Sequence, residues 1–518
     1  MQKVEKFLSK HVFWVVLILS IPAVWALFVP GFYGASDDLH IAWLYELDRV
    51  VKMGQFPPRF VPDLSFGYGY PLFNFVFPLP FYLGEAFHLL GLTFVDSIKA
   101  VFLLSIPLSG YFMYKFVRIY TPGILAIAAA VVYIYTPYRA TDIFVRGAVG
   151  ESLAFVFLPL IAFAVAKGNI GILALSTAGL IMSHNIMAYM FLPFFATLAL
   201  LIGSKIKSFF GFTLGLIISS FFWLPAIVES NLMKYDTVFN FKDHFPTIRQ
   251  LFTPYFGYGA SVAGPYDGMS FFLGLVNIIL VIEAVIHFVR GRSKIVAWAL
   301  FAFSLAIFMM NFRSSIIWDN LPLLPYFQFP WRFLSLTTFI VPVLVIAFAK
   351  HKHLNYFALA IIIAAVALNF RYFKPHDFLG RGDDYYINRY IPVPAASEEY
   401  LKTGEEYLRL PKDTKTRPDK VSPDQGLSAS FNVDYEEETT LDYHKYYFPG
   451  WEVKIDGEKV DVGAGEPYGQ VQFKVPKGEH LIEISFRETP LRKILDVISL
   501  FGLVTALVLI VRRKRGRI

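Results

Sequence analysis

Long apolar runs alternate with short polar or basic segments along most of the chain. Each run is close to the roughly 20 residues that an α-helix needs to cross a hydrocarbon core of about 30 Å. We therefore predict a polytopic α-helical membrane protein with about twelve spans. The predicted spans are 11–30, 98–117, 121–137, 150–166, 169–184, 186–203, 208–227, 270–290, 293–312, 332–350, 354–371 and 491–511.

One further apolar stretch, 72–92, does not fit this series. It contains Pro78 and Pro80, which remove backbone hydrogen-bond donors and break helices. Counting it as a span would also place the two termini on opposite sides of the membrane. We predict that it is a juxtamembrane or re-entrant segment that packs against protein.

Basic residues flank the spans on one side and so orient the chain. Lys3, Lys6 and Lys10 precede the first run, which is long and lacks a small-residue cleavage site, so we expect it to remain as a span. A basic tail, 512–517, follows the last run. The positive-inside rule then places both termini in the cytoplasm and residues 372–490 outside the cytoplasmic membrane.

The chain divides into three parts on this basis. Residues 1–371 form the transmembrane domain, with a first outer loop at 31–71, and residues 491–518 hold the last span and the basic tail. Residues 427–487 alternate apolar and polar positions and contain turn-forming Asp-Gly and Pro-Lys-Gly sequences. We predict a β-sandwich there, within the extracytoplasmic segment 372–490.

Composition and charge narrow the class further. The hydrophobic fraction is 56% and the charged fraction is 17%, against about 25% charged residues in soluble proteins, which excludes an ordinary soluble enzyme. Residues 372–490 carry 15 basic and 23 acidic side chains and are net −8, so the rest of the chain is net +15 and the overall charge of +7 reflects basic membrane-flanking loops. We therefore expect no nucleic-acid partner. The absence of cysteine excludes disulfides, thiolate catalysis and cysteine-ligated metals.

Two adjacent carboxylates, Asp37 and Asp38, follow the first span at the expected membrane surface. Like charges this close disfavour ionisation of both groups unless a cation or a metal compensates. In a partly dehydrated cleft such a carboxylate acts as a general base. The alternative is a cap for a helix over 39–53, a role that suits Ser36, Asp37 and Asp38 equally well. The two roles are compatible.

Arg139, Arg146 and Glu151 lie in one predicted outer loop. Ionisable groups at membrane depth are costly and functional by default, and an arginine pair matches the oxygens of a phosphate or diphosphate. The alternatives are an internal bridge from arginine to Asp142 or Glu151, and an arginine that extends to the membrane interface.

Further candidates lie at the ends of later spans. Trp331 and Arg332, with Gln328, could bind a phosphate, a sugar or a prenyl chain, and an interfacial aromatic belt is the alternative for the tryptophan. His184 and Asn185 have atoms to bind a sugar hydroxyl or a phosphate oxygen, and a turn cap is the alternative. Two carboxylates with a diphosphate would suit Mg²⁺ or Mn²⁺, although no ligand spacing requires a metal.

The order of these features resembles the GT-C superfamily of polytopic glycosyltransferases. Asp37-Asp38-Leu39-His40 is similar to the Asp-Glu-x-His start of the first loop in protein mannosyltransferases. Residues 78–83 (PLPFYL) are similar to the Pro-Pro-Leu-Tyr-Tyr-Trp segment of the lipid A aminoarabinose transferases. The resemblance implies a polyprenyl-phosphate sugar donor, Asp37 as the catalytic carboxylate and His40 near the substrate. Asp38 stands where glutamate is usual.

Nearly the whole chain is also similar to membrane proteins labelled 6-pyruvoyl-tetrahydropterin synthase-related and to YfhO-type proteins. The latter are implicated in glycosylating cell-wall polymers in Gram-positive bacteria. No pterin-synthase domain or zinc-binding histidine set is visible in the sequence. The similar stretches are 66–71 (FGYGYP), 135–139 (YTPYR), 145–147 (VRG) with Glu151, 183–185 (SHN), 328–333 (QFPWRF) and 446–451 (YYFPGW).

We therefore predict an inverting glycosyltransferase that moves a sugar from a polyprenyl-phosphate donor to an extracytoplasmic glycan, cell-wall polymer, lipid or protein. Asp37 or Asp38 would take the acceptor proton, and Arg139, Arg146 or Arg332 would hold the donor phosphate. One alternative is a transporter or flippase of lipid-linked saccharides, for which internal repeats are expected and none is seen. The other is a non-catalytic assembly scaffold.

Overall fold

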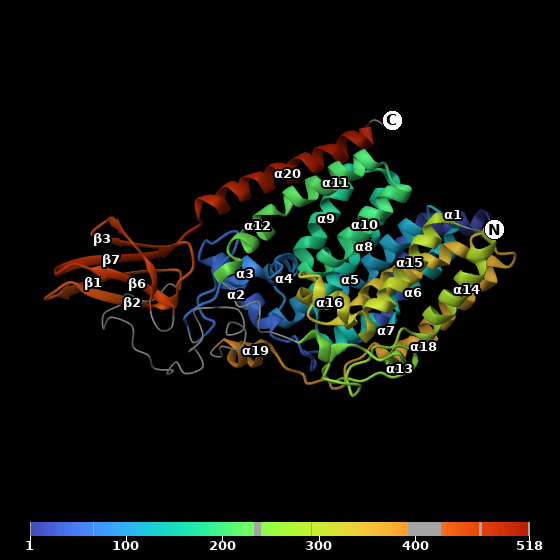
Figure 1. Cartoon of the computed structure of the whole chain (residues 1–518), viewed down its shortest axis with the longest axis horizontal. Helices are drawn as coiled ribbons and strands as arrows, with labels where there is room; N and C mark the ends of the chain where they lie inside the picture. Colours follow the sequence, from blue (N-terminus) through green and yellow to red (C-terminus); the bar gives the residue numbers. More distant parts are fainter. Residues whose placement is uncertain are drawn as a thin grey trace.

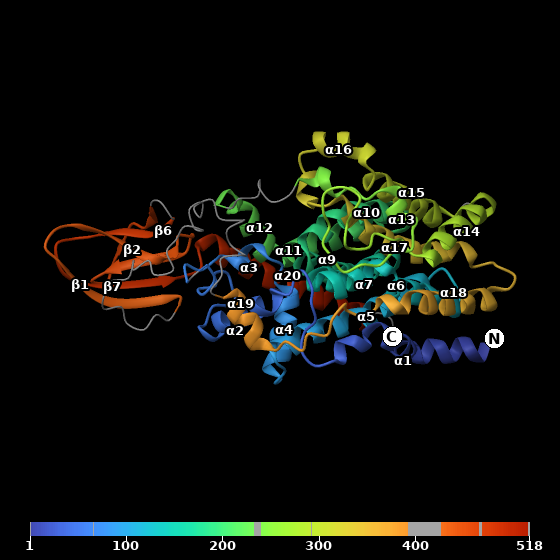
Figure 2. The same ribbon diagram turned by 90° about the horizontal axis from the view of Figure 1, so that it is seen from below.

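The structure is a computed structural model of the chain that describes residues 2–65, 67–232, 240–291, 293–391, 426–465 and 469–515. A long helical body carries a region of β-strands at one end, and both chain termini lie on the side of the body away from the strands (Figures 1 and 2). Phe66 of the FGYGYP stretch, 392–425 and 466–468 of the predicted extracytoplasmic segment lie outside the described residues.

Among the described residues, seven helical segments are long and apolar enough to cross a membrane. The predicted multi-pass helical architecture is thereby confirmed. The seven are Lys10–Phe28 (the greater part of α1, Gln2–Val24, with η1, Trp25–Phe28), α5 (Phe94–Val117), α8 (Val149–Lys167), α10 (Asn185–Ile202), Pro330–Phe348 (η7, Pro330–Phe333; α17, Leu334–Leu344; η8, Val345–Phe348), Leu354–Tyr372 (α18, Leu354–Asn369; η9, Phe370–Tyr372) and Pro490–Arg513 of α20 (Pro490–Arg515).

Three further apolar segments are bent pairs of helices, which brings the count to as many as 10 if each pair is one span. Two shorter apolar helices are α9 (Ile170–Ser183) and Leu275–Val289 of α14 (Leu275–Gly291). The number of twelve spans stays a prediction. The pairs are α6 (Gly123–Ile134) with α7 (Pro137–Thr141) and η2 (Asp142–Arg146) at 42°, α11 (Lys205–Ile218) with α12 (Ser220–Val228) at 69°, and α15 (Lys294–Met309) with η5 (Phe312–Ser314) and α16 (Ser315–Asn320) at 88°.

The bends correct two predicted spans that we took as single helices. The run 121–137 breaks before Pro137, because the residue that precedes a proline disfavours the helical conformation, and Thr136 is extended there with φ −59° and ψ 131°. The run 208–227 breaks at Ser219. At this bend the indole of Trp223 donates to the carbonyl of Leu216 at 3.0 Å and satisfies an oxygen at the end of α11.

The first outer loop and the proline-rich stretch after it form three helices. These are α2 (His40–Lys52), α3 (Leu72–Phe75) and α4 (Leu79–Leu89). With 4 and 11 residues, α3 and α4 are each too short to cross a membrane. The re-entrant placement of 72–92 stays a prediction. Helix α2 packs against α4, α5 and α19 (Asp383–Tyr390).

In the described part of the C-terminal region, seven strands form two sheets, which confirms the β-structure predicted from the alternating pattern. In β3 and β6 the buried side chains alternate with more exposed ones. Asp456 and Gly457 have φ values of +50° and +88°, as a tight hairpin turn between β3 and β4 requires. One sheet has the order β1 (Ser428–Tyr435), β7 (Gly478–Phe486), β3 (Trp451–Ile455) and β4 (Glu458–Val460), and the other has β2 (Thr439–Tyr446), β6 (Gln470–Val475) and β5 (Gly463–Gly465).

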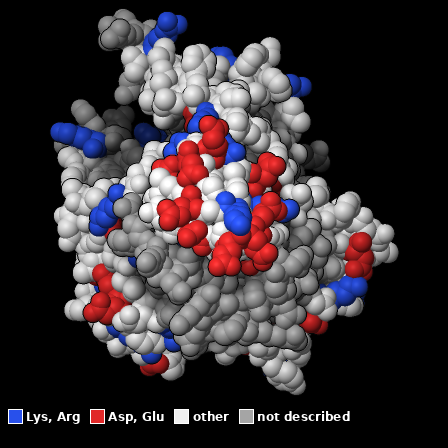
Figure 3. Space-filling view, turned by 90° about the vertical axis from the view of Figure 1, so that its left-hand side faces the viewer, with Lys and Arg blue, Asp and Glu red and all other residues white. Residues whose placement is uncertain are grey.

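The strands are fixed to the first outer loop by backbone and side-chain contacts. The Tyr446 amide of β2 donates to the Tyr68 carbonyl at 2.7 Å. Phe60 packs against Trp451 and Phe486, with ring centroids 5.5 and 5.2 Å apart. The end of the molecule that carries the strands is rich in acidic side chains (Figure 3). Exposed members are Asp434, Glu436, Glu437, Glu438, Asp456 and Glu458.

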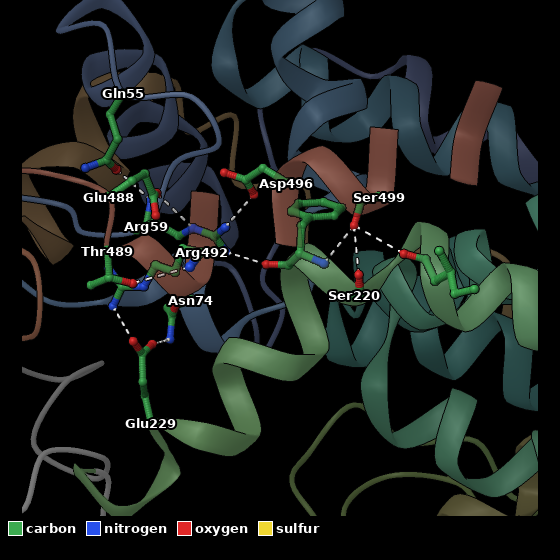
Figure 4. Close-up of polar contacts among 12 residues, drawn as sticks. Gln55, Arg59, Asn74, Ser220, Glu229, Glu488, Thr489, Arg492, Asp496 and Ser499 are labelled. Carbon is green, nitrogen blue, oxygen red and sulfur yellow. Dashed lines mark hydrogen bonds and ion pairs between the residues drawn. The ribbon is translucent and has the colours of Figure 1, made fainter. Parts of the chain in front are cut away.

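Two buried arginines hold the junction between the strands, the outer loop and α20 (Figure 4). Arg59, 1% exposed, donates to Glu488 and Asp496, both at 3.1 Å. Arg492, 0% exposed, donates to Glu229 after α12 at 2.8 Å. Because α20 starts directly after β7, this network sets the position of the strand region relative to the helical body.

Candidate functional site

The turn that carries the acidic pair is held against the end of η2. The Ser36 amide donates to the Val145 carbonyl at 3.1 Å, and the Asp37 amide donates to the Arg146 carbonyl at 2.6 Å. Gly147 has φ +73°, and a Cβ there would lie 3.0 Å from the Cβ of Ala35. This close approach needs glycine. Two segments about a hundred residues apart in sequence therefore meet at the predicted site.

The two carboxylates of the pair have different surroundings. Asp38 is 6% exposed and accepts a hydrogen bond from the Tyr390 hydroxyl of α19, whereas Asp37 is partly exposed. Burial raises the pKa of the Asp38 carboxyl, and the Tyr390 hydrogen bond and the charges of Arg389 and Arg381 act in the opposite direction. Asp38 is therefore a fixed, enclosed group, and Asp37 is the accessible one.

The acidic pair does not cap helix α2 through its side chains, which was the alternative role for these residues. Helix α2 begins at His40 with Leu39 as N-cap, and no side chain among the described residues makes a cap hydrogen bond there. The His40 ring instead lies 3.2 Å, through Nδ1, from the Gly147 carbonyl. Burial lowers the pKa of His40, although the charge of Asp37 opposes this shift. His40 is thus a buried ring next to the acidic turn.

Arg146 forms the internal bridge that was one of the alternatives for the arginines. Its Nη1 lies 2.5 Å from Asp142 and 2.6 Å from Glu151. The Tyr138 hydroxyl donates to the other oxygen of Glu151 at 2.8 Å. Two carboxylates thus already neutralise this guanidinium, which leaves it little capacity for a phosphate.

Arg139 lies apart from this bridge, inside the helical body. It is 0% exposed, and its Nη1 donates to Ser109 at 3.2 Å. The guanidinium carbon lies 4.5 Å from the ring centroid of Phe155 and 5.4 Å from that of Tyr133. None of these contacts is with the acidic turn. The Arg139 guanidinium does interact electrostatically with Asp142 and Glu151, so its link to the site is through the carboxylates that bridge Arg146.

Arg332 interacts electrostatically with Asp37 and has open hydrogen-bonding groups. Nε and Nη2 of Arg139 likewise have no hydrogen-bond partner among the described residues, but none of the contacts given for Arg139 is with the acidic turn. Arg332 is 9% exposed, and its Nη2 donates to Gln328 at 2.9 Å. Its Nε and Nη1 have no hydrogen-bond partner among the described residues. Trp331 is 3% exposed, and its ring centroid lies 5.9 Å from the Arg332 guanidinium carbon and 5.0 Å from that of Arg146. Trp331 thus joins the two arginines within one site.

His184 and Asn185 have the cap geometry that was the alternative to ligand binding. His184 is the N-cap of α10 and accepts from the Met187 amide at 3.2 Å. Its ring stacks on Phe77 at 5.1 Å, and Phe77 also faces His40 at 6.4 Å. The side-chain amide of Asn185 donates through Nδ2 to the Phe75 carbonyl at 3.4 Å. Both residues therefore brace the site wall.

Electrostatic interactions join these groups into one cluster. Asp37 interacts with Arg146 and Arg332, and Glu151 interacts with His184 as well as with both of these arginines. We define the site cluster as the acidic turn together with the groups that face it. Its members are Asp37, Asp38, His40, Arg146, Glu151, His184, Trp331 and Arg332.

A cleft of about 720 Å³ opens beside the acidic turn. One wall is 34–36, which directly precedes Asp37, and the other walls come from Val145, Tyr255, 257–260, Gly268 and 376–377. The residues of these outer walls and Tyr390 were not predicted from the sequence. The only signal in the sequence was the glycine- and tyrosine-rich stretch FGYGA, 256–260.

The sequence allowed a metal centre with Mg²⁺ or Mn²⁺ but did not require one. Among the described residues, no group of three or more His, Asp or Glu side chains is arranged to hold a metal ion. The role of Mg²⁺ or Mn²⁺ stays a prediction.

Comparison with protein-family models gives no match, and comparison with curated proteins gives none. Among solved structures, the chain is similar to the arabinofuranosyltransferase AftD from Mycobacteria, with a TM-score of 0.46 and 14% identity over 71% of this chain and 27% of AftD. The chain thus spans about a quarter of the length of that protein. A similarity at this level carries no conclusion about activity.

Proposed function

We propose that this protein is a GT-C-type membrane glycosyltransferase that moves a sugar from a polyprenyl-phosphate donor to an extracytoplasmic acceptor. One observation carries the proposal. The site cluster places an accessible carboxylate, Asp37, within electrostatic reach of Arg332, a buried cation with open N–H groups. A base and an anion-binding group in one site are what a single displacement at a glycosyl phosphate needs.

In this reaction the acceptor hydroxyl oxygen attacks the anomeric carbon while the bond from that carbon to the phosphate oxygen breaks. The proton of the hydroxyl passes to the Asp37 carboxylate, and polyprenyl phosphate leaves with the bonding electron pair. A single displacement inverts the anomeric centre. The Nε and Nη1 groups of Arg332 donate to the leaving phosphate as its negative charge develops.

The other members of the site cluster position these two groups. Asp38 accepts from Tyr390 and anchors the acidic turn to α19. The Arg146 carbonyl accepts from the Asp37 amide of the turn. The Arg146 guanidinium, neutralised by two carboxylates, lies over one face of Trp331. We therefore assign the base to Asp37 and the phosphate to Arg332, and we assign no substrate to Arg139.

The placement of the termini supports the predicted orientation. Both lie on the side of the helical body away from the strands (Figure 1), as cytoplasmic termini and an extracytoplasmic strand region require. In that orientation the strand region faces the cell envelope. The resemblance to YfhO-type proteins suggests that the acceptor is a cell-wall polymer.

The proposal is tested with purified protein in vesicles, supplied with a panel of radiolabelled polyprenyl-phosphate sugars and envelope glycans as acceptors. We expect transfer by the wild type and a loss of about a hundredfold or more in Asp37→Asn. Asp384→Asn, which changes an exposed carboxylate of α19, is the matched control and should retain activity. Parallel reactions with EDTA, Mg²⁺ or Mn²⁺ measure the metal requirement.

Two outcomes would contradict the proposal. Transfer that survives both Asp37→Asn and Asp38→Asn would remove the catalytic role of the pair. Movement of the donor across the bilayer without transfer, followed with a fluorescent donor analogue, would favour the transporter alternative.

A further inference from the structure

We infer that the cleft beside the acidic turn is the binding site for a neutral saccharide unit of the acceptor. This inference rests on the proposed function and locates its second substrate. The volume of about 720 Å³ falls inside the range of roughly 300–1,000 Å³ that is typical of small-molecule sites. Its lining has the chemistry of a carbohydrate site and not that of a phosphate site.

The charge of the lining separates the acceptor from the donor. Asp377 and His376 are the titratable groups among the lining side chains other than tyrosine, and the described residues that line the cleft include no lysine or arginine. A phosphate would meet a carboxylate there without a compensating arginine or lysine. A ligand rich in hydroxyl groups meets both a strong acceptor and an imidazole. The phosphate therefore belongs at Arg332, and the cleft suits an uncharged sugar.

Two tyrosines give the cleft aromatic faces with fixed orientations. Tyr255 is 50% exposed, and its hydroxyl donates to the Gly268 carbonyl at 3.3 Å. The Tyr258 hydroxyl donates to the Lys374 carbonyl at 3.1 Å. Because the hydroxyls are tethered, the rings are held in place before a ligand arrives. The apolar C–H face of a pyranose or furanose packs on such rings, and preorganisation lowers the cost of binding.

Close backbone packing forms the floor between these rings. Gly259 and Gly268 face each other, and a Cβ on Gly268 would lie 2.5 Å from the Gly259 Cα. A Cβ on Gly257 would lie 2.2 Å from both the Gly268 carbonyl oxygen and the Tyr255 hydroxyl. Side chains at these positions would push apart the two segments of the loop that contain Gly259 and Gly268. The three glycines thus keep the tyrosine-bearing loop closed.

The polar edge of the cleft comes from the segment after η9. His376 Nδ1 lies 2.7 Å from Asp377, and the two side chains are 67% and 64% exposed. The His376 ring also contacts Tyr258, with centroids 5.2 Å apart. A carboxylate and an imidazole beside an aromatic face can bind the equatorial hydroxyls of a sugar while its C–H face lies on the ring.

The cleft borders the segment that carries the proposed base. Its inner wall is Gly34, Ala35 and Ser36, and Asp37 is the next residue. The hydrogen bonds from Ser36 and Asp37 to Val145 and Arg146 hold this wall in place. A sugar seated on the tyrosines would therefore present its terminal hydroxyl toward Asp37.

The test measures saccharide binding at equilibrium, without transfer. Full-length protein in nanodiscs is titrated by calorimetry with linear hexasaccharides of mannose, glucose, galactose and arabinose. We expect at least one of them to bind the wild type and Asp37→Asn alike. Tyr255→Ala and Tyr258→Ala should each weaken this binding about tenfold or more. Tyr255→Phe keeps the ring but loses its tether to Gly268, and should therefore weaken binding less than Tyr255→Ala does.

Tyr266→Ala is the matched control, because Tyr266 is in the same loop, is 87% exposed and does not line the cleft. Wild-type affinity in Tyr255→Ala and Tyr258→Ala, an equal loss in Tyr266→Ala, or no binding of any hexasaccharide to the wild type would overturn the inference. Binding that depends on both tyrosines in a protein without transfer activity would contradict the proposed function and leave the saccharide site standing.

Discussion

The buried ion pair between Arg492 and Glu229 makes a quantitative prediction about the junction of the strand region and the helical body (Figure 4). The guanidinium and the carboxylate are 2.8 Å apart, and their side chains are 0% and 9% exposed. We consider Arg492→Met and Glu229→Gln, which keep much of the volume and remove one charge each, and the double variant. Each single change leaves its partner as an unpaired buried charge.

The expected cost follows from this burial. Removing one partner of a buried pair costs about 3–5 kcal/mol, whereas replacing both partners is often close to neutral. Two guanidinium nitrogens of Arg492, Nε and Nη1, also have no hydrogen-bond partner among the described residues. The arginine therefore depends strongly on Glu229. At about 1.36 kcal/mol per tenfold change, each single variant should raise the population of the locally open junction by roughly a hundredfold or more.

Hydrogen exchange of the backbone amides at the start of α20 measures this opening. We expect much faster exchange in each single variant and exchange within about tenfold of the wild type in the double variant. Lys459→Met is the control. Its pair with Glu452 has the same 2.8 Å separation, but the side chains are 63% and 32% exposed, and an exposed pair contributes only about 0–1 kcal/mol.

Two results would refute the reasoning. Exchange at the wild-type rate in Arg492→Met and Glu229→Gln would mean that the pair is hydrated or already open. A double variant as unstable as the sum of the single variants would mean that each side chain acts through separate packing contacts, such as that of Arg492 with Phe448 at 5.0 Å.

Two further predictions concern the acidic turn. Burial raises the pKa of the Asp38 carboxyl. The contribution of Asp38 to stability is therefore complete below the unfolded-state pKa of about 4 and is lost as the pH rises through the raised folded-state pKa. As the pH rises, Tm should fall less steeply in Asp38→Asn than in the wild type, and parallel curves of Tm against pH would contradict this. Gly147→Ala should lower stability by about 1–3 kcal/mol and reduce sugar transfer, since φ is +73° and the new Cβ lies 3.0 Å from Ala35. Gly54→Ala is the control for backbone strain without a clash, because its φ is +87° and no atom lies within 4 Å of the new Cβ. Equal activity in the two variants would contradict the role of the close approach at Gly147.

The hydrophobic pattern by itself determined the class of architecture. Runs near 20 residues predict membrane helices because only a helix satisfies its own backbone in lipid, and the described part of the chain contains seven such helical segments. Alternation over 427–487 predicted the strands. The bends at Thr136 and Ser219 were not predicted, because an apolar run looks the same whether its helix is straight or broken.

The acidic pair and its partners also separate what the local sequence determined from what the tertiary structure determined. Local sequence marked Asp37, Arg146 and Arg332 as costly polar groups next to the membrane, but it could not distinguish a bridged arginine from an open one. Hydrogen bonds between segments about a hundred residues apart made that choice, by pairing Arg146 with Glu151 and leaving Nε and Nη1 of Arg332 without partners among the described residues.

Sequence by itself therefore determined that this protein is a multi-pass helical membrane protein with a C-terminal β-region and an acidic turn after its first span. The tertiary structure decided which of the two carboxylates is accessible and which arginine beside the acidic turn is bridged by carboxylates. The physical reason is that propensity and hydrophobic period are local properties of the chain. Burial and charge pairing depend on which distant segments meet, and a helix, a glycine turn and a tyrosine loop from separate regions meet at this site.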